Sequence, residues 1–273
     1  MAAAISEFGP YEVMATPPLL GRMLDLDLID KNSFSTVRYI KVGGSPLPAP
    51  IGRRVLEALP SARIVSLYGT TESAKALLTT FWDQHEVDVL GAPGGITSAK
   101  VVDDAGNDLP SGEIGEICVR AEGGSGKLEY FEDAETTEAV FESGWIHTGD
   151  LGYWDDRRRI RLVGRTKEML ILPTGMKVNS FRIEQILRES PEIKDVSVVG
   201  LEQPDKPYDL IAAAIVPKKD DLTTSEVKSI FAALEPELVP GRYILVDDLP
   251  LNGMGKVIRR DVKKLFEEHS IGA

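Results

Sequence analysis

Residues 47–72, LPAPIGRRVLEALPSARIVSLYGTTE, contain the pattern that decides the predicted fold. Leu47 opens a helix-like stretch that runs through Ala58, and residues 63–67 form a short apolar run that is typical of a buried strand. A second helix-like stretch begins after Thr71. Because helix and strand alternate here, the sequence predicts an α/β unit.

The pattern changes on the C-terminal side of this unit. From about residue 89 to residue 163, short strand-like runs alternate with turn signals, which predicts a small β-barrel or sandwich. After Arg165 the sequence predicts an α+β unit, with strands at residues 196–201 and 210–216 and helices near residues 181–189, 225–234 and 259–268. We therefore expect an α/β subdomain over residues 1–88, a β-barrel subdomain over 89–163, a hinge at 164–167 and a C-terminal α+β domain over 168–273.

Charge and hydropathy exclude several classes of protein. The chain has 31 basic and 43 acidic residues and a net charge of -12, which would repel a polyanion, so we expect no nucleic-acid partner. The longest apolar runs are strand-sized, well short of the ~20 residues of a membrane helix. Residues 1–9 lack the charged start and apolar core of a signal peptide, so we expect a cytoplasmic protein without a membrane partner.

The single cysteine, Cys118, lies in a strand-like run over residues 113–121. One cysteine cannot form a disulfide within the chain. We therefore expect Cys118 to be a buried structural thiol and not a reactive one.

Five short stretches contain the side chains that could carry chemistry: GGSP at residues 43–46, YGTTE at 68–72, TGD at 148–150, GRTK at 164–167 and GMGK at 253–256. Each of them alone also fits a structural role. A Gly-Gly-Ser-Pro stretch is a common loop, and Thr-Thr-Glu after a strand can cap a helix. Asp150 fits a turn, Arg165 a surface ion pair, and Lys256 a glycine turn before a basic helix.

The same stretches also admit a functional interpretation. Tyr68 offers a ring that could stack on a base, and Thr71 offers a hydroxyl that could donate to a phosphate. Glu72 offers a carboxylate for Mg²⁺, and Asp150 an acceptor for the hydroxyls of a ribose. Arg165 would add fixed positive charge near the ribose and phosphate.

In order and spacing these stretches resemble the adenylate-forming superfamily, which includes acyl-CoA and aryl-CoA synthetases, the adenylation domains of nonribosomal peptide synthetases, and luciferases. The matching series is GGSPL at residues 43–47, YGTTE at 68–72, GEICVR at 115–120, GWIHTGD at 144–150, GRTK at 164–167 and PLNGMGK at 250–256. The resemblance implies an ATP-dependent ligase that forms an acyl-AMP from a carboxylic acid and then transfers the acyl group to a thiol. The thiol would belong to CoA or to the phosphopantetheine of a carrier protein.

The resemblance also implies a role for each candidate residue. Adenine would lie between Tyr68 and the loop of Gly44, Ser45 and Pro46, with Gly69 and Thr70 also in the nucleotide site; Thr71 would hold the α-phosphate, Glu72 would bind Mg²⁺, and Asp150 and Arg165 would hold the ribose.

In the C-terminal domain, Lys256 resembles the lysine that bridges the carboxylate and the α-phosphate in the first half-reaction. Lys167 matches the family's hinge position, about which the C-terminal domain acts as a mobile lid, and Gly175 resembles the glycine that lines the pantetheine tunnel. Asn252 stands where threonine is common in the family.

One large part of the family pattern is missing. The family holds the β- and γ-phosphates with a loop of the form S-G-T-T-G-x-P-K-G, and nothing before Gly43 resembles it. The sequence therefore predicts a partial α/β subdomain. Three alternatives remain open: one component of a split enzyme, a truncated fragment, and a non-catalytic remnant that binds nucleotide or a partner. We expect a complementary N-terminal chain, or self-association through residues 8–28.

Overall fold

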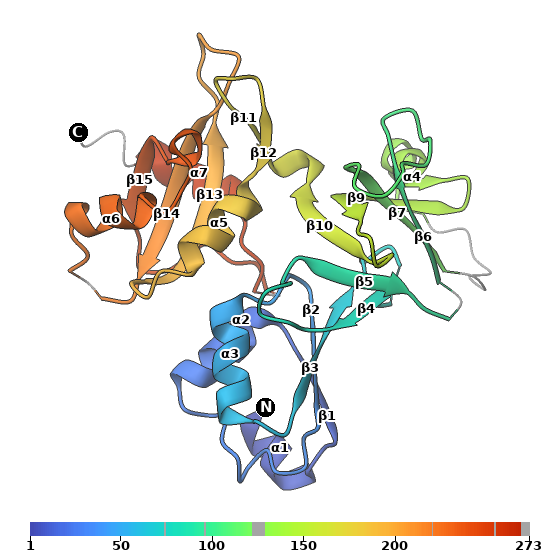
Figure 1. Cartoon of the computed structure of the whole chain (residues 1–273), viewed down its shortest axis with the longest axis vertical. Helices are drawn as coiled ribbons and strands as arrows, with labels where there is room; N and C mark the ends of the chain where they lie inside the picture. Colours follow the sequence, from blue (N-terminus) through green and yellow to red (C-terminus); the bar gives the residue numbers. More distant parts are fainter. Residues whose placement is uncertain (74, 96, 122–128, 220, 254, 269–273) are drawn as a thin grey trace. The chain divides into compact units, whose positions relative to one another are not determined.

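The computed structural model describes residues 1–73, 75–95, 97–121, 129–219, 221–253 and 255–268. The chain divides into two compact units, Met1–Val163 and Gly164–Ala273. Figure 1 shows the elements of both units. Among the described residues, no helix has the length and apolar character that a membrane crossing requires.

The first unit is organised around a ten-stranded sheet whose main path runs β1-β2-β3-β4-β5-β10-β9-β7-β6, with β8 paired to β9. Its strands are β1 (Glu12–Ala15), β2 (Tyr39–Gly43), β3 (Arg63–Tyr68), β4 (Leu78–Phe81), β5 (Val89–Pro93), β6 (Thr97–Val102), β7 (Gly115–Ala121), β8 (Phe141–Glu142), β9 (Trp145–Trp154) and β10 (Ile160–Arg165). β1, β2 and β3 are parallel, and the pairs β3-β4, β4-β5, β5-β10, β9-β7 and β7-β6 are antiparallel. The parallel strands of the α/β part therefore continue by hydrogen bonds into the antiparallel part.

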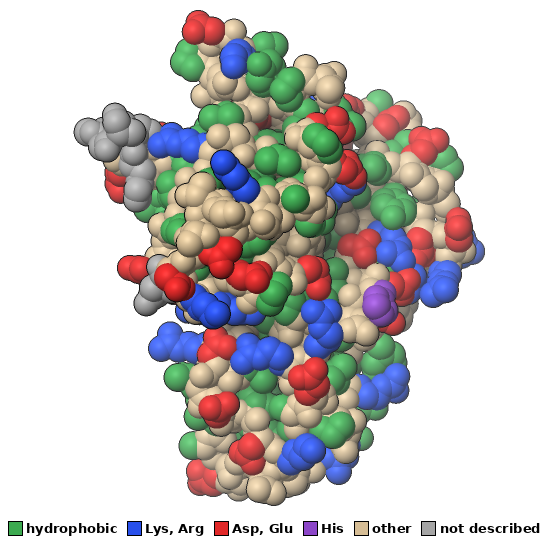
Figure 2. All heavy atoms as spheres, turned by 60° about the vertical axis from the view of Figure 1, so that its left-hand side comes forward, with side chains coloured by type: hydrophobic (Ala, Val, Ile, Leu, Met, Phe, Trp, Pro, Cys, Tyr) green, Lys and Arg blue, Asp and Glu red, His purple; other side chains and the backbone are tan. Residues whose placement is uncertain are grey.

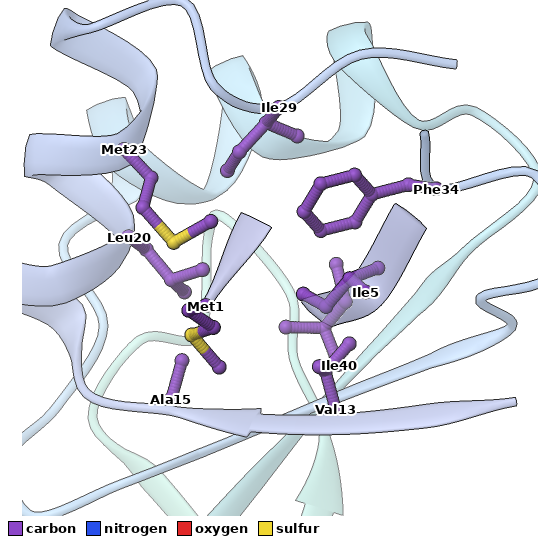
Figure 3. A pocket seen from close by; sticks show the side chains of 9 residues that line it. All are labelled: Met1, Ile5, Val13, Ala15, Leu20, Met23, Ile29, Phe34 and Ile40. Atoms are coloured by element: carbon purple, nitrogen blue, oxygen red, sulfur yellow. The ribbon is translucent and has the colours of Figure 1, made fainter. Parts of the chain in front are cut away.

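The helices of this unit are α1 (Ala2–Phe8), α2 (Pro17–Asp25), α3 (Ala49–Ala58) and α4 (Ala134–Val140). Buried side chains of α1, α2 and α3 form one apolar cluster with buried side chains of β2 and β3, such as Ile40 and Ile64. Figure 3 shows a cavity inside this cluster, lined only by hydrophobic residues. Because the lining offers no charged or polar side chain, this cavity belongs to the core and is unsuited to an anionic substrate.

The second unit contains a hairpin, a three-stranded sheet and three α-helices among its described residues. In chain order these are η1 (Thr166–Glu168), β11 (Met169–Ile171), β12 (Lys177–Asn179), α5 (Ser180–Arg188), β13 (Ile193–Leu201), β14 (Leu210–Pro217), α6 (Thr224–Phe231), η2 (Pro236–Leu238), β15 (Arg242–Leu245) and α7 (Arg259–Glu268). The sheet order is β13-β14-β15.

The position of β14 at the centre of its sheet explains why residues 210–216 form a continuous apolar run. Ala213 and Ile215 pack in the cluster that contains α5 and α6, whereas Ala212 and Ala214 pack in the cluster that contains α7. Side chains of a strand alternate between the two faces of the sheet, and helices cover both faces of β14. A strand that is covered on both faces needs apolar residues at every position.

A buried ion network links α5, α7 and β13 within this unit. The Arg259 guanidinium donates to Glu184 Oε1 at 2.7 Å and to the Val198 carbonyl at 2.7 Å, and Arg188 Nη1 lies 3.2 Å from Glu184 Oε2. Burial alone would raise the pKa of the Glu184 carboxyl, but the charges of Arg259 and Arg188 hold this pKa below its usual value. The buried carboxylate is therefore the partner of two arginines.

Acidic and basic side chains are both exposed on the face of the molecule that Figure 2 shows. The two kinds of side chain are interspersed there. Acidic side chains therefore do not form one continuous patch on this face.

We predict that Glu184→Gln lowers the free energy of unfolding by about 3–5 kcal/mol, because removing one member of a buried ion network leaves the others without compensation. Urea titration followed by circular dichroism measures this change. The matched control is Glu237→Gln at an exposed position of η2, which should change stability by less than about 0.5 kcal/mol. Equal effects of the two substitutions would show that the buried ion network contributes nothing to the free energy of unfolding.

Candidate functional site

The segment after β3 forms a turn and not the helix that the sequence predicts after Thr71. Ser73 Oγ accepts from the Thr70 amide at 3.0 Å and donates to the Lys75 carbonyl at 2.8 Å, and Thr70 Oγ1 accepts from the Ser73 amide at 3.2 Å. These side chains satisfy backbone groups that a helix would otherwise pair, so they favour the turn. The prediction of a helix here is wrong, and the chain continues into β4.

Glycine is required at position 69 because the backbone of Lys75 approaches it closely in this turn. A Cβ atom at position 69 would lie 2.3 Å from the Lys75 carbonyl oxygen. No side chain fits at that distance, so only glycine lets the chain fold back here. The turn therefore keeps Thr71 exposed and Glu72 half-buried directly after β3.

Two of the predicted site residues meet at the end of β3. The Tyr68 hydroxyl donates to Asp150 Oδ2 at 2.7 Å, and both side chains are half-buried. Asp150 lies in β9, where its amide donates to Thr148 Oγ1 at 3.1 Å, and the Thr148 hydroxyl donates to the Ile117 carbonyl of β7 at 2.7 Å. The strand pairing of β7 and β9 thus fixes the carboxylate beside the aromatic ring.

Glu72 has a partner that the sequence did not predict. The Tyr130 hydroxyl donates to Glu72 Oε1 at 2.5 Å, and this hydrogen bond, together with burial, raises the pKa of Tyr130 to about 12. Tyr130 therefore remains a neutral donor at physiological pH. No motif predicts this pair, because Tyr130 lies outside all of the motifs. The contact orients one carboxylate, which suits the one or two carboxylates that Mg²⁺ commonly takes from a protein.

The loop of Gly44, Ser45 and Pro46 follows β2. Gly43 and Leu67 are opposite each other in the parallel pair of β2 and β3, so the loops after these two strands leave the same edge of the sheet. Gly44 and Ser45 are exposed and Pro46 is half-buried. The carboxyl edge of parallel strands is the usual ligand-binding edge of an α/β sheet.

The remaining predicted site residues belong to the second unit. Arg165 ends β10, Lys167 is exposed in η1, Gly175 is exposed between β11 and β12 with φ 80°, and Lys256 is exposed before α7. The structure brings Tyr68 and Asp150 together inside the first unit. Arg165, Lys167, Gly175 and Lys256 all lie in the second unit.

The turn that carries Lys256 is closed by Asn252. Asn252 Oδ1 accepts from the Lys256 amide at 3.0 Å, and the Asn252 amide donates to the Lys256 carbonyl at 2.8 Å. Leu251 and Val257 form an isolated antiparallel bridge on either side. Asn252 thus provides the side-chain acceptor of this turn at a position where the family commonly has threonine.

The start of the second unit is shaped by Gly164 and Asn179. Gly164 has φ 151°, and a Cβ atom there would lie 1.9 Å from Asn179 Cγ. Asn179 accepts from the Phe181 amide at the start of α5 and donates to the Arg165 carbonyl at 3.1 Å. Glycine at position 164 leaves the space in which Asn179 joins the GRTK segment to α5.

Comparison with known proteins identifies the class to which this fold and these groups belong. The model of the AMP-binding enzyme family matches residues 1–126, and the model of the AMP-binding enzyme C-terminal domain matches residues 182–256. The chain is 30% identical over 252 residues to a long-chain-fatty-acid–CoA ligase of Escherichia coli O6:H1, an alignment that covers 90% of this chain and 43% of that protein. It is 30% identical over 258 residues to 4-coumarate–CoA ligase 1 of Glycine max, covering 90% of this chain and 86% of that protein.

A solved structure gives the same result. The amide bond synthetase McbA from Marinactinospora thermotolerans superposes with a TM-score of 0.83 and 26% identity, covering 97% of this chain and 54% of that chain. This chain therefore belongs to the AMP-binding, adenylate-forming enzymes, and the predicted family and fold class are confirmed. The chain spans about half the length of most of the relatives that it matches, such as the 43% of the E. coli ligase.

Proposed function

We propose that the chain forms the adenosine-binding part and the C-terminal domain of an ATP-dependent carboxylic acid ligase, which makes an acyl-AMP and then an acyl thioester. The observation that supports this proposal best is the hydrogen bond from Tyr68 to Asp150. It sets a flat ring, suited to stacking on adenine, beside a carboxylate that is suited to accept from ribose hydroxyls. Arg165 would add a donor for the ribose or phosphate.

The residues after Tyr68 would bind the phosphate end of the nucleotide. In this proposal the exposed Thr71 hydroxyl donates to the α-phosphate, and Glu72, oriented by Tyr130, binds Mg²⁺. A bound magnesium ion would neutralise phosphate charge. Gly44, Ser45 and Pro46, on the same edge of the sheet, would cover the other face of adenine, with Gly69 and Thr70 as backbone contacts.

Lys256 would supply the positive charge for the first half-reaction. Its ammonium group would stabilise the negative charge that develops as a carboxylate attacks the α-phosphate. Its exposed position on a turn closed by Asn252 supports this role, because an exposed ammonium group is accessible to a substrate. A movement about Lys167 would withdraw Lys256 after the first step and present Gly175, at the tip of the β11–β12 hairpin, to a pantetheine thiol.

The alternative proposal is a non-catalytic protein that binds nucleotide or a partner. The nucleotide-binding form of this alternative shares the adenosine site with the ligase, and only the ligase includes turnover.

We predict that Asp150→Ala weakens AMP binding about 10- to 100-fold, the loss expected for a charged hydrogen-bond acceptor. Isothermal titration calorimetry of the purified chain with AMP measures this change. The control is Asp156→Ala, which removes an exposed carboxylate of the neighbouring turn and should leave the affinity unchanged. An undiminished affinity in Asp150→Ala would rule out the adenosine site proposed here.

We predict that acid-dependent exchange of pyrophosphate into ATP falls about 10²- to 10³-fold in Lys256→Ala, by loss of electrostatic stabilisation. The assay uses a panel of carboxylic acids and the chain co-expressed with the polypeptide encoded upstream of it. Lys263→Ala, at an exposed position of α7, is the matched control. AMP binding without exchange under every condition would favour the non-catalytic alternative.

We also propose that residues 8–28 contact further polypeptide, the N-terminal half of the ligase. In this region Phe8, Tyr11 and Met14 are exposed by 75%, 63% and 64%, and β1 ends the sheet path. A sheet edge flanked by exposed apolar side chains is a surface that proteins commonly cover.

Size-exclusion chromatography with light scattering tests this contact. We predict that the chain alone self-associates and that Met14→Lys reduces the association, because a charge on the exposed edge opposes strand pairing. Ile114→Lys is the control, since Ile114 is an exposed apolar residue elsewhere in the first unit. A monodisperse monomer of the unaltered chain would contradict the predicted self-association.

A further inference from the structure

The face of β7 that points away from the apolar core carries a group of metal-ligating side chains. Ile117 and Val119 pack in the apolar cluster of the antiparallel part. Side chains alternate along a strand, so Glu116 and Cys118 point to the opposite face. Cys118 is fully buried on that face, outside the apolar cluster.

His147 of β9 lies directly opposite Cys118 in the antiparallel pair. Cys118 Sγ lies 3.5 Å from His147 Nδ1, and Glu116 Oε2 lies 2.7 Å from the same nitrogen. The three ligand atoms are all within 4.8 Å of one another, and the part of the chain that the structure describes has no other such group of three. The register of β7 and β9 has therefore placed a thiol, an imidazole and a carboxylate around one point.

His147 Nδ1 has two neighbours with different requirements, the Glu116 carboxylate and the Cys118 sulfur. If Nδ1 carries the proton and donates to Glu116, it cannot also accept from the Cys118 thiol. A divalent cation would bind all three groups as ligands and would offset the repulsion between carboxylate and thiolate.

The distance between Cys118 Sγ and His147 Nδ1 agrees with that of a tetrahedral zinc site, and the distance between Glu116 Oε2 and His147 Nδ1 is shorter. Zinc bonds of about 2.3 Å to sulfur and 2.0–2.2 Å to nitrogen and oxygen place sulfur and nitrogen about 3.6 Å apart, and nitrogen and oxygen about 3.4 Å apart. The observed distance from Sγ to Nδ1 is 3.5 Å. Glu116 Oε2 would withdraw by about 0.7 Å from Nδ1 to reach the tetrahedral spacing. The Glu116 side chain is 28% exposed, so it has space for that movement.

We propose that Glu116, Cys118 and His147 form a binding site for Zn²⁺ or a similar divalent transition metal. The metal bonds to the thiolate sulfur, and the thiol proton passes to solvent. A water molecule completes four-coordination. This site is distinct from the Mg²⁺ position proposed at Glu72, because thiolate and imidazole ligands select zinc-like ions over magnesium.

The site would affect the neighbouring segment that holds Asp150. Glu116 Oε1 accepts from the Gly149 amide at 2.9 Å, so the same carboxylate contacts both the proposed metal position and the residue before Asp150. A metal bound between β7 and β9 would link the two strands at this point.

Cobalt spectroscopy of the untagged, reduced chain tests the proposal. Cys118 is the single cysteine of the 273 residues, so a thiolate-to-cobalt charge-transfer band can arise only from this residue. We expect a band that saturates at about one Co²⁺ per chain and disappears when Zn²⁺ is added. Cys118→Ser should abolish the band, and His147→Gln and Glu116→Gln should each weaken Zn²⁺ binding at least tenfold in calorimetry.

The matched control is His85→Gln, which removes an exposed histidine outside the group and should leave metal affinity unchanged. Circular dichroism establishes that each variant is folded. The cobalt titration of the unaltered chain tests the proposal even if a variant fails to fold. Absence of the band and of Zn²⁺ binding in the folded, unaltered chain would overturn the proposal. A band that persists at full strength in both His147→Gln and Glu116→Gln would also overturn it, because the thiol would then bind metal without this site.

Discussion

The hydrogen bond between Tyr68 and Asp150 is the contact on which the proposed site depends. It joins two residues 82 positions apart, one at the end of a parallel strand and one in an antiparallel strand. Three features make it possible: β3 continues into the turn that requires Gly69, β9 is held to β7 through Thr148, and the sheet is continuous from β3 to β9. The adenosine site proposed here is therefore a product of joining an α/β part to an antiparallel part.

The sequence predicted the elements whose signal is apolar periodicity. Residues 63–67, 210–216 and 259–268 lie in β3, β14 and α7, because each buries a face or both faces of the element. The helix predicted after Thr71 failed for a different reason. Ser73 and Thr70 bond to the backbone of the turn, and such local side-chain bonds are invisible to a periodicity argument.

Only those residues of the candidate site that lie in a recognised motif could be predicted from the sequence. Tyr68 and Asp150 each lie in a motif, so their proximity could be expected from the family resemblance. Tyr130, the partner of Glu72 58 positions away, lies in none. The meeting of Cys118 and His147 depends on the register of β7 and β9, and a shift of one residue would send one of the two to the other face.

The turn before α7 has a property that follows from Asn252. Hydrogen bonds between Asn252, Gly255 and Lys256 stabilise the turn from within the loop itself. Just beyond it, Arg259 is fixed in the buried network with Glu184. Lys256 thus lies on a turn that is stabilised by its own hydrogen bonds and is followed by a buried ion network. In this arrangement the backbone needs little reorganisation when the lysine side chain binds an anion.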